Sequence, residues 1–106
     1  MSVRANEDDQ WGFYRSEVAK RIVPGFSGEV VISAEKGVVQ GVRPTQFIKY
    51  RHPPGGPLSP DENARNDRCL EDAFDRIAPD FYGKITITVH DGRTILYRVD
   101  QTFKDF

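Results

Sequence analysis

The chain contains one internal repeat, and this repeat constrains the fold more than any other feature of the sequence. When the chain is shifted by 55 positions, segment 21–49 aligns without gaps to segment 76–104, and 10 of the 29 aligned pairs are identical. Average composition would give about two identities. The identical pairs are Arg21/Arg76, Ile22/Ile77, Pro24/Pro79, Phe26/Phe81, Gly28/Gly83, Ile32/Ile87, Gly37/Gly92, Arg43/Arg98, Gln46/Gln101 and Lys49/Lys104. We therefore predict two copies of one supersecondary unit, since two copies are too few for a solenoid.

Each copy is predicted to begin with a helix. In the second copy, residues 59–62 (Ser-Pro-Asp-Glu) form a capping box with proline at the first helical position, which predicts a helix over about 60–78. Its apolar residues recur at three- and four-residue spacing and are expected to face the core: Leu70, Ala73, Phe74 and Ile77. The acidic residues Glu71, Asp72 and Asp75 are expected to face water.

The first copy is expected to contain the matching helix. Asp8 or Asp9 is a suitable cap for its start. Its inner face is predicted to comprise Trp11, Tyr14, Val18 and Ile22. Pro24 and Pro79 mark the ends of the two helices, because proline cannot continue a helix.

A hairpin is predicted after each helix. Residues 84–89 alternate strictly, so Ile85, Ile87 and Val89 are expected to face the helices. Asp91-Gly92 suits a two-residue turn, after which the chain returns through Ile95, Tyr97 and Val99, with Tyr97 directed toward the core. The first copy repeats this pattern with inward Val30, Ile32 and Ala34, a turn at Lys36-Gly37 and a return strand over 38–43. Pro44 lacks a backbone donor and indicates a sheet edge or a bulge at that point.

These elements together predict a single α+β domain over residues 1–106. Repeat 1 covers about 9–50, a proline- and glycine-rich linker covers about 51–59, and repeat 2 covers about 60–106. We expect two αββ repeats to form a four-stranded antiparallel sheet with two helices on one face, related by a pseudo-twofold axis. The two return strands are expected to lie outside and the two first strands in the centre.

Composition limits the classes of partner. The chain has 15 basic and 16 acidic residues, so it has no bulk positive charge with which to attract a nucleic acid or an anionic membrane. It contains no run near the ~18 apolar residues that a membrane span requires. The single cysteine, Cys69, excludes an internal disulfide and fits a reducing compartment. We expect a cytoplasmic protein with no membrane partner.

Residues with catalytic potential are few. His90 precedes the hairpin turn beside Asp91, where a polar turn-flanking role is favoured over that of a catalytic base. His52 lies in the linker, where precise catalysis or metal binding is not expected. Nearby Arg65 and Arg68 would favour a reactive Cys69 thiolate, but a partly buried helical side chain is the preferred interpretation. No nucleotide, metal or nucleophile motif is present, so we predict no catalytic residues, no cofactor, no metal and no enzymatic activity.

The sheet face opposite the helices is the candidate binding face. Its candidate binding residues are Arg43, Lys84, Thr86, Thr88 and Arg98. The same face is expected to include Glu29, Val31, Ser33, Val39 and Leu96. Stacking aromatic residues are not expected there, because Tyr97 alternates toward the core and Phe26 and Phe81 fall at the border. An ordinary solvated surface ranks first for this face, a protein partner or self-association second, and a single nucleic-acid strand third.

The second copy resembles the small bacterial YezD/OscA family, short proteins linked to sulfur utilisation and sulfur starvation. The resemblance covers about 35 residues and is carried by Ala73, Ile77, the segments 81–87 (Phe-Tyr-Gly-Lys-Ile-Thr-Ile) and 89–93 (Val-His-Asp-Gly-Arg), Gln101 and Lys104. Family members are about as long as one copy. The resemblance therefore implies that this chain fuses two copies and converts a homodimer-like arrangement into one polypeptide. The first copy departs from the motif at its turn, Glu35-Lys36-Gly37, and no catalytic residue is carried over.

From these features we predict a small non-enzymatic interaction or regulatory protein, linked to sulfur or other nutrient stress. The first alternative is a weak single-stranded nucleic-acid-binding module that uses Arg43, Arg98 and the neighbouring lysines. The second is a small accessory or phage-type inhibitor of a host protein.

Overall fold

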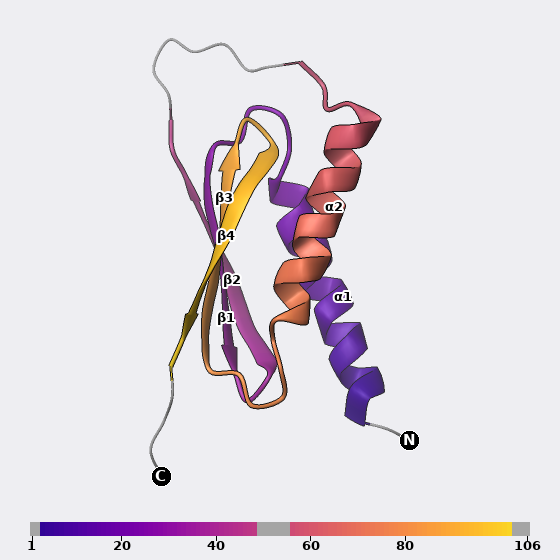
Figure 1. Ribbon diagram of the computed structural model, residues 1–106, viewed down its shortest axis with the longest axis vertical. Coiled ribbons are helices and arrows are strands. Elements are labelled where there is room, and N and C mark those ends of the chain that lie inside the picture. Colours follow the sequence, from indigo (N-terminus) through magenta and orange to yellow (C-terminus); the bar gives the residue numbers. More distant parts are fainter. Residues whose placement is uncertain (1–2, 49–55, 103–106) are drawn as a thin grey trace.

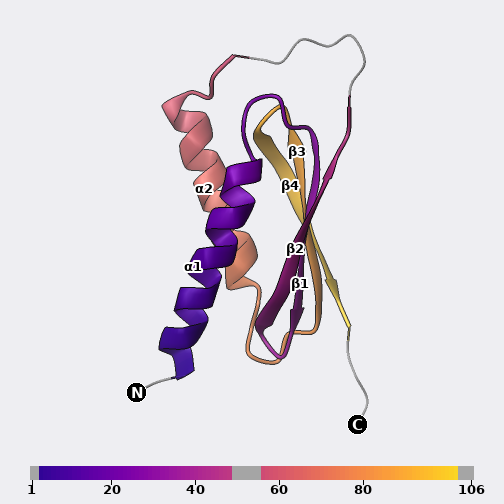
Figure 2. The same cartoon turned by 180° about the vertical axis from the view of Figure 1, so that it is seen from behind.

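The predicted α+β architecture is confirmed. The computed structural model describes residues 3–48 and 56–102, with side chains from residue 12 onward. Its elements, in chain order, are α1 (Val3–Arg21), β1 (Gly28–Glu35), β2 (Val38–Gln46), α2 (Pro60–Asp75), β3 (Gly83–His90) and β4 (Arg93–Gln101). The four strands form one antiparallel sheet in the order β2-β1-β3-β4, as expected from the repeat. Both helices cover the same face of this sheet and leave the other face bare (Figures 1 and 2).

The two units meet where β1 pairs with β3, and this pairing has the symmetry of the repeat. Val30 pairs with Ile87 and Ile32 with Ile85, while Val31 pairs with Thr86 at the centre. Val31 and Thr86 occupy matching positions of the two copies, so the pseudo-twofold axis passes between them. One sheet therefore joins both units.

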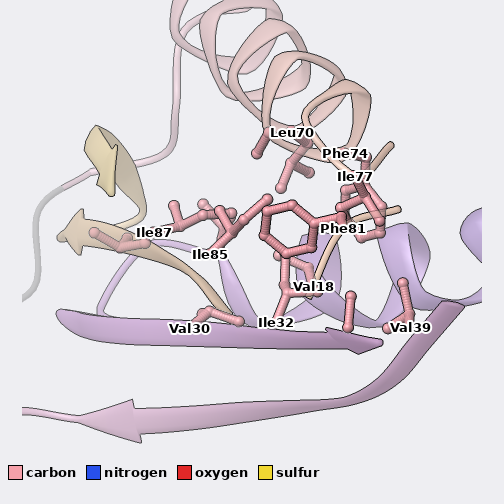
Figure 3. Packing of buried hydrophobic residues seen from close by; sticks show 14 residues of the cluster. Val18, Val30, Ile32, Val39, Leu70, Phe74, Ile77, Phe81, Ile85 and Ile87 are labelled. Carbon is pink, nitrogen blue, oxygen red and sulfur yellow. The ribbon is translucent and has the colours of Figure 1, made fainter. Parts of the chain in front are cut away.

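The core lies between the sheet and the two helices. Figure 3 shows Leu70 and Phe74 of α2 pointing toward Ile85 and Ile32 of the central strands. The buried hydrophobic residues are Val18, Ile22, Val30, Ile32, Ala34, Val39, Leu70, Ala73, Phe74, Ile77, Phe81, Ile85, Ile87 and Val89. Both repeats contribute to this one cluster, which explains why the two units fold together.

The helix boundaries differ from the sequence predictions. α1 is already helical from Val3, so Asp8 and Asp9 lie within the helix and do not cap its start. The residues upstream of these aspartates include Arg4, Ala5 and Glu7, which favour helix and extend it toward the terminus. Tyr14, Val18 and Ile22 pack on or in the core as expected. The side chain of Trp11 lies outside the described residues.

α2 begins at the predicted capping box and ends earlier than predicted. The Glu62 backbone N–H donates to Ser59 Oγ at 3.1 Å, and the Ser59 N–H donates to Glu62 Oε1 at 2.9 Å. The helix ends at Asp75 with Arg76 as its cap, whereas residue 78 was expected, because Pro79 prevents the last turn from closing. Of the predicted linker, residues 56–59 are irregular and 51–55, with His52, lie outside the described residues.

Matching bulges in the two hairpins overturn one prediction about the sheet. Ser33 pairs with Gly41 but Ala34 pairs with Val39, which leaves Gln40 as an extra residue. In the same way Ile95 is extra opposite Thr88 and Val89. The bulge shifts the alternation by one residue, so Val39 is buried in the core at 2% exposure and does not lie on the outer face. β2 is an edge strand as Pro44 indicated, but its bulge is at Gln40.

Each hairpin turn is held by the other unit. Both turns have two residues with positive φ, Lys36-Gly37 and Asp91-Gly92, as two-residue hairpin turns require. The Gly37 N–H donates to the Phe81 carbonyl at 3.1 Å, and the Gly92 N–H donates to the Phe26 carbonyl at 2.8 Å. We call these two reciprocal contacts the clasp. It joins the turn of one repeat to the helix–strand connector of the other.

The second turn carries additional bonds that break the symmetry. Asp91 Oδ1 accepts the Gly25 N–H at 2.7 Å, and the Asp91 N–H donates to Ser27 Oγ at 2.9 Å. The buried Asn66 side chain donates to the Gly92 carbonyl at 2.8 Å and accepts the Thr94 N–H at 3.0 Å. Lys36 stands where Asp91 would be in the first repeat and offers no carboxylate. The second hairpin is therefore fixed more firmly to the rest of the molecule.

Glu62 links the start of α2 to this turn and predicts an acid-sensitive fold. Its bonds with Ser59 and an ion pair with Arg93 lower the pKa of Glu62 from 4.5 to about 2. Since the folded pKa is the lower one, the carboxylate stabilises the fold above pH 4.5, and this stabilisation is lost as the pH falls toward 2. We expect Glu62→Gln to be less stable than the wild type in urea at neutral pH and to lose less stability on acidification. The neighbouring Asp61→Asn is the control, and parallel pH profiles for wild type and Glu62→Gln would contradict the prediction.

Candidate binding face

The helix-free face consists of three rows of side chains that cross the sheet. Pairing places Arg43, Val31, Thr86 and Arg98 in the central row, one residue from each strand in the order β2-β1-β3-β4. The pseudo-twofold axis maps this row onto itself. One flanking row contains Thr45, Glu29, Thr88 and Leu96, and the other contains Gly41, Ser33, Lys84 and Asp100. All five predicted site residues thus lie on one face.

The central row has a neutral floor between two cations. Thr86 is only 5% exposed, and Val31 beside it is half-buried. Arg43 and Arg98 are exposed at the two ends, three strand spacings or about 14 Å apart. Arg98 Nε lies 3.1 Å from Asp100 Oδ2, whereas Arg43 makes no ion pair with another described residue. Two arginine side chains therefore face solvent from the two outer strands of one sheet.

Aromatic side chains do not contribute to the three rows. Tyr97 and Phe26 are partly buried and pack against the core, which lies on the helix-covered side of the sheet. Phe81 was expected at the border of the face, but it is buried in the core at 2% exposure. It lies in the connector before β3, where the sheet ends and the helices close over it (Figure 3). The three rows therefore lack a stacking platform for bases, although Phe47, which follows β2, is 51% exposed.

A groove of about 730 Å³ separates α2 from the edge strand β4 on the other side of the sheet. Its lining residues are Arg65, Arg68, Cys69, Glu71, Asp72, Asp75, Thr94, Ile95, Leu96 and Tyr97. The Tyr97 hydroxyl donates to Asp72 Oδ2 and accepts from Arg76 Nε at 3.0 Å. These bonds fix β4 to α2, and the bond to Asp72 raises the pKa of Tyr97 above its usual value.

Cys69 lies in this groove and has little thiolate character. Burial raises the pKa of its thiol, and the charge of Asp72 raises it further, although a hydrogen bond with Thr94 acts in the opposite direction. A thiol with a raised pKa is a weak nucleophile at neutral pH. The structure therefore favours a packing role for Cys69, in line with its half-buried position.

The other residues with catalytic or metal-binding potential do not form a common site among the described residues. His90 is exposed at the end of β3, while the neighbouring Asp91 carboxylate accepts the Gly25 N–H of the first repeat. In the described part of the chain, no three His, Cys, Asp or Glu side chains gather into a group able to hold a metal ion. None of the described helices is long and apolar enough to cross a membrane.

Sequence reasoning missed two residues that shape these surfaces. Asn66 was not singled out, yet it is buried and holds both Gly92 and Thr94. Ile95 was expected within a regular strand, and the bulge instead leaves it 58% exposed beside the groove. The position of Asn66 could have been noticed in the sequence, because it is a polar residue within the otherwise apolar stripe of α2. Ile95 carries no such signal.

Comparison with known proteins gives no relative. The chain matches no protein-family model, no curated protein and no solved structure at a significant level.

Proposed function

We propose that the chain is a small non-enzymatic interaction protein whose helix-free face binds an acidic surface of a protein partner. The observation that carries this proposal is the Arg43/Arg98 pair. Several identical pairs of the repeat serve packing or the clasp, including Ile32/Ile87 and Gly37/Gly92. Arg43 and Arg98 are identical too, but both are exposed on a face that no helix covers.

The chemistry of the face defines the partner. Two arginines about 14 Å apart suit carboxylates at a similar spacing, since guanidinium groups bind carboxylates through paired hydrogen bonds. Val31 and the 54%-exposed Leu96 provide apolar contact beside them. The rigid sheet lowers the entropy cost of presenting these groups. An acidic protein surface with a small apolar centre therefore fits the face best.

The biological setting belongs to the same proposal. The motif at residues 81–93 resembles the YezD/OscA family, so we propose a partner that acts in a bacterial response to sulfur or other nutrient limitation. The single cysteine fits a reducing compartment, and we place the protein in the cytoplasm. Inhibition of a host protein would use the same face and is one form that the interaction can take.

Reversal of both arginine charges tests the proposal. The partner is captured from native lysate, purified, and its affinity measured for wild type and for the double variant Arg43→Glu/Arg98→Glu. We expect at least a tenfold loss of affinity, because the opposite charges would repel the acidic surface. The control is Arg15→Glu/Lys20→Glu, which makes the same change in net charge on α1. Equal loss in both double variants, or none in either, would refute the proposal.

Nucleic acid is the competing ligand for this face. Arg43, Lys84 and Arg98 would contact phosphates, but the absence of aromatic side chains from the three rows disfavours base stacking. The test is the binding of a single-stranded oligonucleotide to wild type and to Arg43→Glu/Arg98→Glu. If wild type binds it, with an affinity that falls steeply with salt, and the double variant does not, the ligand of this face is a nucleic acid and not a protein.

A further inference from the structure

The two outer strands, β4 and β2, occupy matching positions in the repeat, so their residues can be compared one by one. Three exposed apolar residues lie on β4: Ile95, Leu96 and Val99, at 58%, 54% and 38% exposure. The matching positions of β2 are Gln40, Gly41 and Pro44. Pro44 removes a backbone donor from β2, whereas β4 has nine residues and no proline. Only β4 therefore combines an open hydrogen-bonding edge with apolar side chains.

The helix beside this edge carries an ordered series of charges. α2 presents Arg65 and Arg68 to the groove in its first half, and Glu71, Asp72 and Asp75 in its second half. Arg65 and Asp75 lie five residues before and after position 70, and Arg68 and Asp72 lie two residues before and after it. When a second copy of α2 packs antiparallel to the first and both are centred on position 70, the basic residues of each helix face the acidic residues of the other.

Most of these charges lack an ion-pair partner among the residues that the structure describes. Arg65, Arg68 and Asp75 form no ion pair with the described residues, whereas Asp72 lies 4.0 Å from Arg76 and accepts a hydrogen bond from the Tyr97 hydroxyl. In α1 the matching positions are Gln10, Phe13, Glu17 and Lys20. The charge series is therefore a property of the second unit and not of the repeat.

We propose that this edge binds a second copy of the chain. Two β4 strands pair antiparallel across a twofold axis and join two four-stranded sheets into one. The two α2 helices then lie side by side over the seam, since a helix on a sheet covers about two strands at ~4.8 Å spacing. Arg65 of each copy faces Asp75 of the other, and Arg68 faces Asp72. The apolar residues of β4 are covered in the same step.

This self-association can be separated from the proposed function through Arg43, which lies on β2 at the opposite edge of the sheet, although Leu96 and Arg98 of the helix-free face lie on β4 itself. The dimer would carry two such faces on the same side of one sheet. Failure of dimerisation therefore leaves the proposed partner untouched, and loss of partner binding in the single variant Arg43→Glu leaves the dimer intact.

A charge exchange within one chain provides the test, with mass measured by analytical ultracentrifugation. Arg65→Glu and Asp75→Arg each place like charges opposite one another twice in the dimer, so each should weaken it at least tenfold. The double variant Arg65→Glu/Asp75→Arg restores opposite charges and should recover most of the affinity. A mixture of the two single variants should form a heterodimer. Higher salt should weaken the wild-type dimer.

The strand contribution is tested by a matched pair of lysines. Ile95→Lys places a charge on the β4 edge and should weaken the dimer, whereas Gln40→Lys makes the same addition at the matching point of β2 and should not. Circular dichroism establishes that each variant is folded. A wild-type chain that remains monomeric near millimolar concentration overturns the proposal. So does a dimer that responds to neither the charge exchange nor Ile95→Lys.

Discussion

Replacement of Gly92 by alanine is expected to destabilise the protein by about 3 kcal/mol or more, through strain and overpacking together. Gly92 has φ +78° in the second hairpin turn. A β-carbon on it would lie 2.5 Å from the carbonyl carbon of Val23 and 2.6 Å from the nitrogen of Pro24. These are backbone atoms, so the clash cannot be relieved by a side-chain rotation. The contact of Gly92 with the connector of the first repeat would have to open.

Urea denaturation of Gly92→Ala measures this loss, and Gly41→Ala is the matched control. Gly41 also lies in the sheet, but a β-carbon there meets no atom within 4 Å. We expect a fall of about 2 M in the urea midpoint for Gly92→Ala and little change for Gly41→Ala. Gly37→Ala should behave like Gly92→Ala, because its β-carbon would lie 2.7 Å from the Ala78 carbonyl oxygen. Similar midpoints for Gly92→Ala and Gly41→Ala would show that the clasp has no role in stability.

Truncation of Phe81 to alanine is the second large effect, with an expected cost of about 4 kcal/mol. Phe81 is buried among side chains from both repeats (Figure 3), and its removal leaves a cavity that a clasped connector cannot collapse to fill. Phe26 occupies the matching position but is only partly buried. Phe26→Ala should therefore cost about half as much, by the same scaling of cost with buried volume. Thermal and urea unfolding give the free energy of unfolding of both variants. A loss of stability in Phe26→Ala that equals or exceeds the loss in Phe81→Ala would contradict this prediction.

The sequence predicted the framework of the fold because the relevant signals are local and appear twice. Strict alternation at Ile85 and Ile87, the glycine turns and the capping box at Ser59 each specify one element. The repeat then specifies how the two units combine, since the register of Val30 with Ile87 follows its symmetry. The positions of Arg43 and Arg98 on one face follow from that register.

The errors arose where the structure depends on distant contacts. Val39 was misplaced because a bulge, which depends on the fit of two strands, shifted the alternation. Phe81 was misplaced because its burial depends on the helices that close over the connector. The start of α1 was misplaced because Asp8 and Asp9 are good caps in the sequence, but the residues before them also favour helix and extend it to Val3. The groove beside α2 was not foreseen, since it requires knowledge of both α2 and β4.

The clasp has a consequence for how a duplicated chain can change over time. Since Gly37 touches the connector of the second unit and Gly92 that of the first, a substitution at either turn must be tolerated by the opposite half. Duplication normally frees one copy to diverge, but that freedom is withheld at these two glycines. It remains at the periphery, where Gln40 and Ile95 have become different residues. New binding properties of this molecule are therefore expected to arise on its outer strands, while the two turn glycines stay unchanged.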